Sequence, residues 1–201
     1  MGCRHSRGRA MLRRTRKRQG RRLERGFTLI ELLVTMSVAA VVLALAVPSL
    51  ASFIRSNRLT SAANEMAVTL QTARTSAMSN RARVAVCPST DGSTCSATLG
   101  NRWIAVMTKN GVSTVLRDQT IHAGVTVRAS TNLSGGSNRF TFFPSGFSVV
   151  GTNAAGTVNG AVGFCVAQLS GNNGIDVSSS VGRISTARRA ATSSCSAPAD
   201  N

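Results

Sequence analysis

A carboxylate within an apolar stretch is the first feature of this chain that suggests chemistry. The segment from Phe27 to Val47 is 21 residues long, and Glu31 is the only charged residue in it. An acidic side chain in a membrane helix costs about 2.5–3.5 kcal/mol at the bilayer centre, and such residues are usually paired and functional. We therefore expect an opposite charge for Glu31.

Phe27 is the residue that would provide this charge. If the chain is cut between Gly26 and Phe27, Phe27 gains a free α-amine. Glu31 follows four residues later and lies on the same face of a helix. The carboxylate would then neutralise an α-amine, in its own chain or in a neighbouring subunit. The alternative is an acidic residue that is merely tolerated near the membrane interface.

The apolar segment has the length of a membrane helix. At about 1.5 Å per residue, it just spans a hydrocarbon core of about 30 Å. An ordinary secretory signal has a shorter apolar core, followed by a small-residue cleavage site. Here the expected cut precedes the apolar residues, so the helix stays in the mature protein.

Most of the positive charge lies before this cut. Residues 1–26 contain eleven of the 24 Lys and Arg residues and one of the seven acids. The rest of the chain has 13 basic and six acidic residues, so its net charge is +7 rather than +17. Basic residues next to an apolar segment hold that end in the cytoplasm. The overall charge is therefore no evidence for nucleic-acid binding.

Five cysteines are present, and Cys3 lies in the basic leader. An even number beyond a membrane anchor predicts two disulfides in an oxidising compartment. Three connectivities are open; local pairing favours one bond in a short loop and one that ties the C-terminal segment to the domain. A zinc site does not suit the spacing, which has no C-x-x-C pattern. The favoured pairs are Cys87–Cys95 and Cys165–Cys195.

The residues around the expected cut form a recognisable motif. Residues 25–34 read Arg-Gly-Phe-Thr-Leu-Ile-Glu-Leu-Leu-Val. This sequence resembles the cleavage and methylation motif of type IV pilins and type II secretion pseudopilins. The resemblance implies cleavage after Gly26 by a prepilin peptidase, N-methylation of Phe27 and a role for Glu31 in filament register. Pro48 falls where this family commonly has a helix-kinking proline. Met11 is an alternative start that would shorten the leader and remove Cys3.

Beyond Pro48 the sequence predicts more helix and then strands. One apolar stripe at three- and four-residue steps continues the helix to about residue 80. Short β-like segments separated by Gly, Ser and Asn turns follow.

We expect an α+β fold, a long helix packed on an antiparallel β-sheet domain. Its parts are a leader (1–26), a transmembrane or filament-core helix (27–48), an amphipathic helix (49–80) and a β-rich periplasmic domain (81–201). The stripe comprises Ile54, Leu59, Ala62, Ala63, Met66, Leu70, Ala73 and Ala77, and the strands are 84–87, 103–108, 115–117, 125–128, 140–143, 161–167, 175–177 and 182–186.

Two finer expectations concern this domain. Residues 133–138 and 151–156 are rich in Gly, Ser and Asn and suit hairpin connections. Trp103 begins a strand in which Ala105 and Met107 follow on the same face, which predicts a core residue rather than a platform for base stacking.

The β-rich region resembles the GspH/FimT family of minor pseudopilins and minor pilins. The resemblance rests on residues 70–77, 83–87, 101–103 and 140–146, which read LQTARTSA, RVAVC, NRW and FTFFPSG. It implies a non-enzymatic filament subunit without a cofactor, and we find no catalytic motif in the chain. The implied partners are the inner membrane, a prepilin peptidase that is also an N-methyltransferase, and other pilins or pseudopilins. The chain would cross the membrane once, with its N-terminus cytoplasmic, before it enters the filament.

DNA binding is the alternative that the resemblance raises. The FimT branch includes DNA-binding minor pilins with a basic C-terminal Gly-Arg-x-Arg pattern. Residues 182–185 read Gly-Arg-Ile-Ser, so the second arginine is missing, and Arg188 and Arg189 follow. Arg183, Arg188 and Arg189 would contact phosphates without reading the base sequence, and salt would weaken the binding steeply. The competing interpretation is a solvated basic segment. Whether a secretion pseudopilus or a type IV pilus recruits the chain stays open.

Overall fold

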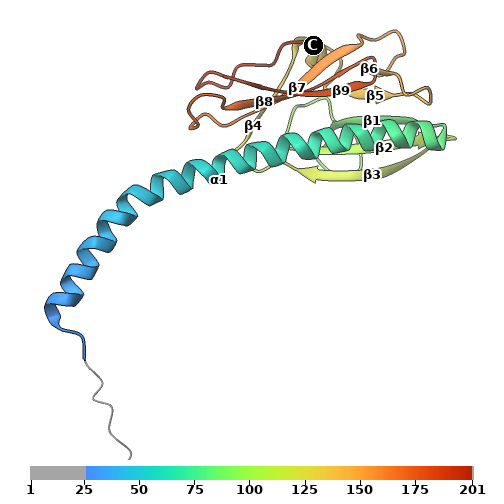
Figure 1. Cartoon of the computed structure of the whole chain (residues 1–201). Helices are drawn as coiled ribbons and strands as arrows, with labels where there is room; N and C mark the ends of the chain where they lie inside the picture. Colours follow the sequence, from blue (N-terminus) through green and yellow to red (C-terminus); the bar gives the residue numbers. More distant parts are fainter. Residues whose placement is uncertain (1–25, 201) are drawn as a thin grey trace, which may run out of the picture. The chain divides into compact units, whose positions relative to one another are not determined.

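The computed structural model of the protein describes residues 26–200. It divides into two units, with the boundary between Leu43 and Ala44. One helix, α1 (Leu29–Asn80), contributes residues to both units (Figure 1). The predicted basic leader, with Cys3 and the alternative start Met11, lies outside the described residues, apart from Gly26.

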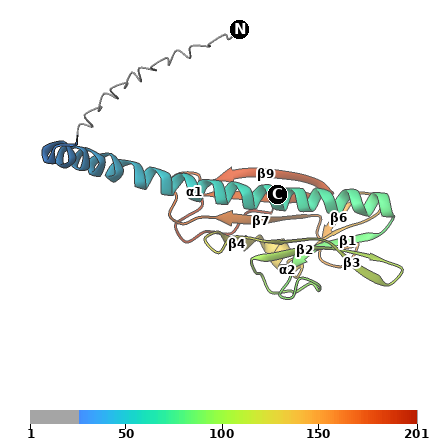
Figure 2. The same cartoon turned by 90° about the horizontal axis from the view of Figure 1, so that it is seen from below.

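The part of α1 that belongs to the second unit packs on the β-strands (Figures 1 and 2). Its buried side chains recur at three- and four-residue steps, which confirms most of the predicted stripe. Ile54 was wrongly placed in it, because burial on α1 begins only at Leu59 and Ile54 is 42% exposed. The buried residues are Leu59, Ala62, Ala63, Met66, Thr69, Leu70, Ala73 and Ala77.

The C-terminal end of α1 is closed by a left-handed residue. Arg81 follows the last helical residue with φ of 50°. The Ala82 N–H then donates to the Ala77 carbonyl at 3.2 Å. This six-to-one bond satisfies a carbonyl that the helix end would otherwise leave unpaired. The helix therefore ends at Asn80, as the sequence predicts.

Within residues 26–200, nine strands form two antiparallel sheets, so the expected α+β class is correct and the single expected sheet is in fact two. The first sheet has the order β3-β2-β1-β5-β6, and the second has the order β4-β7-β8-β9. The first contains β1 (Arg83–Pro88), β2 (Arg102–Lys109), β3 (Val112–Thr120), β5 (Phe140–Phe142) and β6 (Ser148–Val150). The second contains β4 (Thr126–Ala129), β7 (Asn159–Cys165), β8 (Gly174–Ser180) and β9 (Arg183–Arg189).

One apolar core joins α1 to both sheets. Met66 and Leu70 of α1 belong to the same buried cluster as Val84 of the first sheet and Val177 of the second. Trp103 is fully buried in this cluster, and its indole Nε1 donates to the Gly100 carbonyl at 3.0 Å. This confirms Trp103 as a core residue, because its one polar atom is satisfied inside the domain.

The connections between the two sheets differ from those predicted from the sequence. Residues 133–138, expected as a hairpin loop, begin inside a short helix, α2 (Thr131–Gly135), that joins β4 of one sheet to β5 of the other. Ser130 caps this helix by accepting from the Leu133 N–H, and Leu133 is fully buried. The chain also forms the three-residue strand β6, which was not predicted.

The connection at residues 151–156 is likewise not a hairpin within one sheet. It leads from β6 in the first sheet to β7 in the second. A single antiparallel bridge, Val150 to Thr157, closes it. Both errors have one cause, since local composition predicts a turn and says nothing about which sheet the next strand joins.

Candidate functional site

The residues of the expected cleavage site stand at the start of α1. Gly26 and Phe27 precede the helix, and Phe27 is 81% exposed. Glu31 lies in the first turn, where its negative charge suits the positive end of the helix. Its backbone N–H donates to Thr28 Oγ1 at 3.3 Å. Thr28 therefore caps the helix, a role that the spacing Thr-x-x-Glu could have revealed.

The first unit leaves its apolar side chains uncovered. Every residue from Leu29 to Leu43 is exposed, although nearly all of them are apolar. By length and composition, α1 contains a segment that could cross a membrane. Exposed apolar surface of this extent marks contact with lipid or with other proteins.

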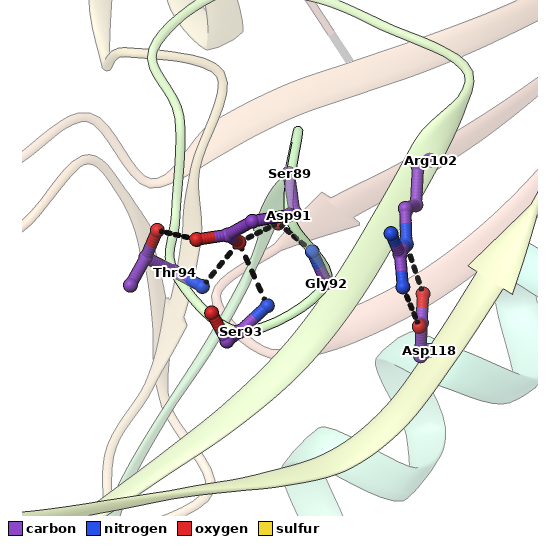
Figure 3. A network of polar contacts seen from close by, with 7 residues as sticks. All are labelled: Ser89, Asp91, Gly92, Ser93, Thr94, Arg102 and Asp118. Atoms are coloured by element: carbon purple, nitrogen blue, oxygen red, sulfur yellow. Dashed lines mark hydrogen bonds and ion pairs between the residues drawn. The ribbon is translucent and has the colours of Figure 1, made fainter.

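The loop closed by Cys87 and Cys95 is held by a single carboxylate (Figure 3). Asp91 Oδ1 accepts from the backbone N–H groups of Ser93 and Thr94, each at 2.8 Å, and Oδ2 accepts from Thr94 Oγ1 at 2.7 Å. These donors, the Thr94 N–H first, hold the pKa of Asp91 far below its ordinary value. The loop is therefore ordered by hydrogen bonds rather than by an apolar interior.

Next to this loop, an ion pair joins β2 to β3. Arg102 donates from Nη2 to Asp118 Oδ2 at 2.6 Å and from Nε to Oδ1 at 3.0 Å (Figure 3). This bidentate contact lowers the pKa of Asp118 and raises that of Arg102. Gly92 has φ of 78°, and a Cβ there would overlap the Arg102 guanidinium. The loop thus needs a glycine where it passes over the arginine.

The second disulfide, Cys165–Cys195, ties the C-terminal segment to the second sheet. Arg128 of β4 donates to the Cys195 carbonyl at 3.2 Å, and the Asn132 N–H donates to Asp200 Oδ1 at 3.0 Å. The structure thus contains both favoured cysteine pairs, with Cys165 and Cys195 30 residues apart.

The three arginines proposed for DNA lie on β9, but they do not form one cluster. Side chains alternate along a strand, so the neighbouring residues Arg188 and Arg189 lie on opposite faces, while Arg183 is the first residue of the strand, beside the β8–β9 turn. Arg188 is exposed and donates to Thr60 of α1 at 3.2 Å. Arg183 is exposed at the start of the strand. Arg189 is half-buried, and it is ion-paired with Asp176 at 2.7 Å.

Arg189 also makes further bonds that hold its guanidinium. Nη2 donates to the Ser196 carbonyl at 2.6 Å, and Nη1 donates to Ser196 Oγ at 3.0 Å. Its charge is therefore used to fasten the C-terminal segment. The sequence did not show this partner, because Asp176 is on another strand.

Two family models match the chain, and their ranges agree with the two parts described above. A model described as the prokaryotic N-terminal methylation motif matches residues 21–47. A model described as type II transport protein GspH matches residues 62–182, which is more than half of the chain. The chain belongs to the GspH family. The match begins inside the packed half of α1 and ends at Gly182 in the β8–β9 turn, so it covers β1 to β8 and leaves β9 out.

This GspH-family chain is also similar to solved structures. Two crystal structures of the type IV minor pilin FimU from Pseudomonas aeruginosa match it, with 25% and 24% sequence identity. They cover 73% and 70% of this chain and 96% and 97% of their own chains, with TM-scores of 0.48 and 0.46. No curated protein matches the sequence. The methylation motif and the apolar helix together indicate a membrane-anchored, pilin-type subunit.

Proposed function

We propose that this protein is a minor pilin or pseudopilin that enters a helical filament through the first half of α1. The observation that supports it most is the uncovered apolar surface from Leu29 to Leu43, which contains one acid near a cleavage motif. The β domain has its own core and does not need this surface to fold. The surface is therefore available first to lipid and then to the same segment of other subunits.

Glu31 is the residue that would set the register of assembly. Cleavage after Gly26 creates an α-amine at Phe27 that the precursor lacks. An unpaired carboxylate between packed apolar helices is costly, so the subunit is best accommodated where Glu31 meets such an amine. In the precursor the uncut leader blocks that pairing. Processing by the peptidase would thus be required before the subunit can enter the filament of a type II secretion system or a type IV pilus.

The orientation follows from the charges around this helix. The basic leader stays in the cytoplasm by the positive-inside rule, which places the β domain in the periplasm. The two disulfides agree with that oxidising compartment. The subunit is structural, and its partners are other pilins or pseudopilins.

The test begins with the N-terminus of the protein in its own cells. Mass spectrometry is expected to find N-methyl-Phe27, and Gly26→Val is expected to leave the precursor in the inner membrane. Glu31→Gln removes only the charge, so we expect normal insertion and processing but little protein in the filament fraction. Glu65→Gln on the packed half of α1 is the matched control. An intact leader in wild-type cells, or normal incorporation of Glu31→Gln, would overturn the proposal.

A DNA-receptor role remains a second proposal, because Arg183 and Arg188 are exposed. Gel-shift titration of the processed chain, which begins at Phe27, in detergent micelles tests it. The Arg183→Gln/Arg188→Gln double variant should bind DNA more weakly and with a smaller salt slope. Arg55→Gln/Arg58→Gln removes equal charge elsewhere and is the control. Equal affinity in the two double variants would remove this role.

A further inference from the structure

The turn between β8 and β9 contains a residue that is unusual for its conformation. Val181 and Gly182 form a two-residue hairpin loop, and both have positive φ, 54° and 88°. Such turns favour Asn-Gly, and a β-branched residue with positive φ is a genuine outlier. The β2–β3 hairpin shows the ordinary solution, since Asn110 and Gly111 have φ of 51° and 79°.

The surrounding structure holds this turn in place. The Val181 N–H donates to the Val158 carbonyl at 3.2 Å, and the Gly182 N–H donates to Ser148 Oγ at 2.7 Å. A Cβ on Gly182 would overlap the Gly146 carbonyl oxygen. Strain that is held in this way is found most often at functional sites. Here it presents an apolar side chain, because Val181 is 54% exposed.

Val181 stands between two hollows on the surface. The first lies between the end of α1 and the β8–β9 turn and has a volume of about 810 Å³. The second lies between this turn and the loop after β5 and has a volume of about 660 Å³. Both are lined by Arg74 and Val181. We call the two together the β8–β9 cleft.

Among residues 26–200, the lining of the cleft contains basic side chains and no acidic ones. Arg74 and Arg183 both line the first hollow, whereas none of the described residues that line either hollow is acidic. Nε of Arg74 is buried and has no hydrogen-bond partner within residues 26–200. A buried donor without an acceptor is costly, and guanidinium groups match carboxylates in geometry and charge.

The rest of the lining is apolar. Met78 of α1 is 40% exposed, and Ile184 and Val181 complete one wall of the first hollow. Phe143 lines the second hollow, with the Arg83 guanidinium 5.2 Å from its ring centroid. A phosphodiester backbone makes no use of such a wall, but a peptide with an apolar side chain next to an acid uses both features.

From these observations we propose that the β8–β9 cleft binds a peptide segment of another protein, in which Asp or Glu lies next to a bulky apolar residue. Arg74 and Arg183 bind the carboxylate, and Met78, Val181 and Ile184 contact the apolar side chain. The segment continues past Val181 into the second hollow. This site is separate from the apolar half of α1, so the inference stands whether or not the filament proposal holds.

Panning a random peptide library against the processed chain, which begins at Phe27, in detergent micelles tests the proposal. We expect enrichment of peptides with Asp or Glu beside Leu, Ile, Val, Met or Phe. A selected peptide should bind about tenfold more weakly when its acid is changed to the amide, since a charge-assisted hydrogen bond is lost. Arg74→Gln and Arg183→Gln should each weaken the wild-type peptide by a similar factor. Enrichment without acids, or none at all, would overturn the proposal.

Matched variants separate this site from general charge attraction. Arg188→Gln lies on the same strand but outside the cleft, so it should change the affinity less than twofold. Val181→Asn keeps the turn and removes the apolar contact, so it should weaken binding severalfold. Unfolding midpoints of all variants show whether they are folded. Equal losses with Arg188→Gln, an unchanged affinity of Val181→Asn, or displacement of the peptide by a single-stranded oligonucleotide would each contradict a peptide site of this kind.

Discussion

Arg189 and Asp176 form an ion pair on the second sheet, with Nε 2.7 Å from Oδ2. The side chain of Asp176 is 7% exposed and that of Arg189 is 21% exposed. The same guanidinium bonds Ser196, so one arginine joins β8, β9 and the C-terminal segment. Of the three basic residues on this strand, Arg189 is therefore the one whose role in the fold is clearest.

Arg189→Gln is expected to lower the free energy of unfolding by about 2–3 kcal/mol, because it leaves a buried carboxylate without its cation. Urea denaturation of the full chain in micelles measures this. Arg183→Gln should stay within about 0.5 kcal/mol of the wild type. The double variant Arg189→Met/Asp176→Leu should lose less than Arg189→Gln, since it leaves no unpaired charge. Equal effects of Arg189→Gln and Arg183→Gln would contradict the structural role of this pair.

The two disulfides should differ in what they stabilise. The cysteines are 30 residues apart in Cys165–Cys195 and eight apart in Cys87–Cys95. The chain-entropy estimate gives about 3–4 kcal/mol for the longer loop and about 2–3 kcal/mol for the shorter one. Paired Cys→Ala variants, compared by urea denaturation, check the order.

The same variants have a local signature. Only removal of Cys165–Cys195 should release the C-terminal segment, so trypsin should cut faster after Arg188 and Arg189 in that variant. The variant without Cys87–Cys95 serves as the control. Equal cleavage rates in the two would show that the hydrogen bonds of Arg189 and Asp200 hold the segment by themselves.

Val181→Asn is expected to stabilise the protein by about 1 kcal/mol, because asparagine tolerates positive φ where valine is strained. The reciprocal change, Asn110→Val in the β2–β3 hairpin, should destabilise it by a similar amount. Thermal unfolding of both variants measures the pair of effects. A loss of stability in Val181→Asn would mean that the packing of the valine side chain outweighs the strain of its backbone.

The Cys87–Cys95 loop should respond to acid. The pKa of Asp91 is lowered from 3.8 by hydrogen bonds to the ionised carboxylate. A group with a depressed folded pKa adds stability above its unfolded pKa and loses it as the pH falls toward the folded value. The loop should therefore be unaffected between about pH 5 and pH 8, and it should loosen as the pH falls below about 4.

Hydrogen exchange of the Ser93 and Thr94 amides as a function of pH is the measurement for this loop. Asp91→Asn should exchange faster than the wild type at neutral pH and lose most of the acid dependence. Asp118 also has a lowered pKa, so Asp118→Asn shows how much of the acid response belongs to the Arg102 ion pair. An unchanged pH profile in Asp91→Asn would assign the response elsewhere.

The parts of this protein that the sequence predicted best are those that depend on neighbouring residues. The cleavage motif, the length of the apolar segment and the helical stripe from Leu59 to Ala77 are all local patterns. The same holds for most strands, because alternation and turn residues mark their ends. Even there, Thr28 as a helix cap was missed, although Thr-x-x-Glu is a local signal.

Where prediction failed, residues far apart in sequence decide the structure. Residues 133–135 belong to a capped helix rather than a hairpin loop, because the side chain of Leu133 is buried in the core. Arg189 is held by Asp176, and its partner could not be named before β8 and β9 were paired. The β9 arginines looked like one basic cluster, yet Arg188 donates to Thr60 of α1 while Arg189 is bound to Asp176.

The sequence by itself therefore determined that this chain carries an apolar N-terminal helix with a methylation motif, followed by a β-rich domain. Those features depend only on the composition, charge and periodicity of short stretches of sequence. Only the tertiary structure decided which cysteines meet, that Arg189 is bound while Arg74 and Arg183 face a cleft, and that Val181 has a left-handed backbone. These depend on sheet pairing and on the packing of α1, which bring distant residues together at distances that no local pattern encodes.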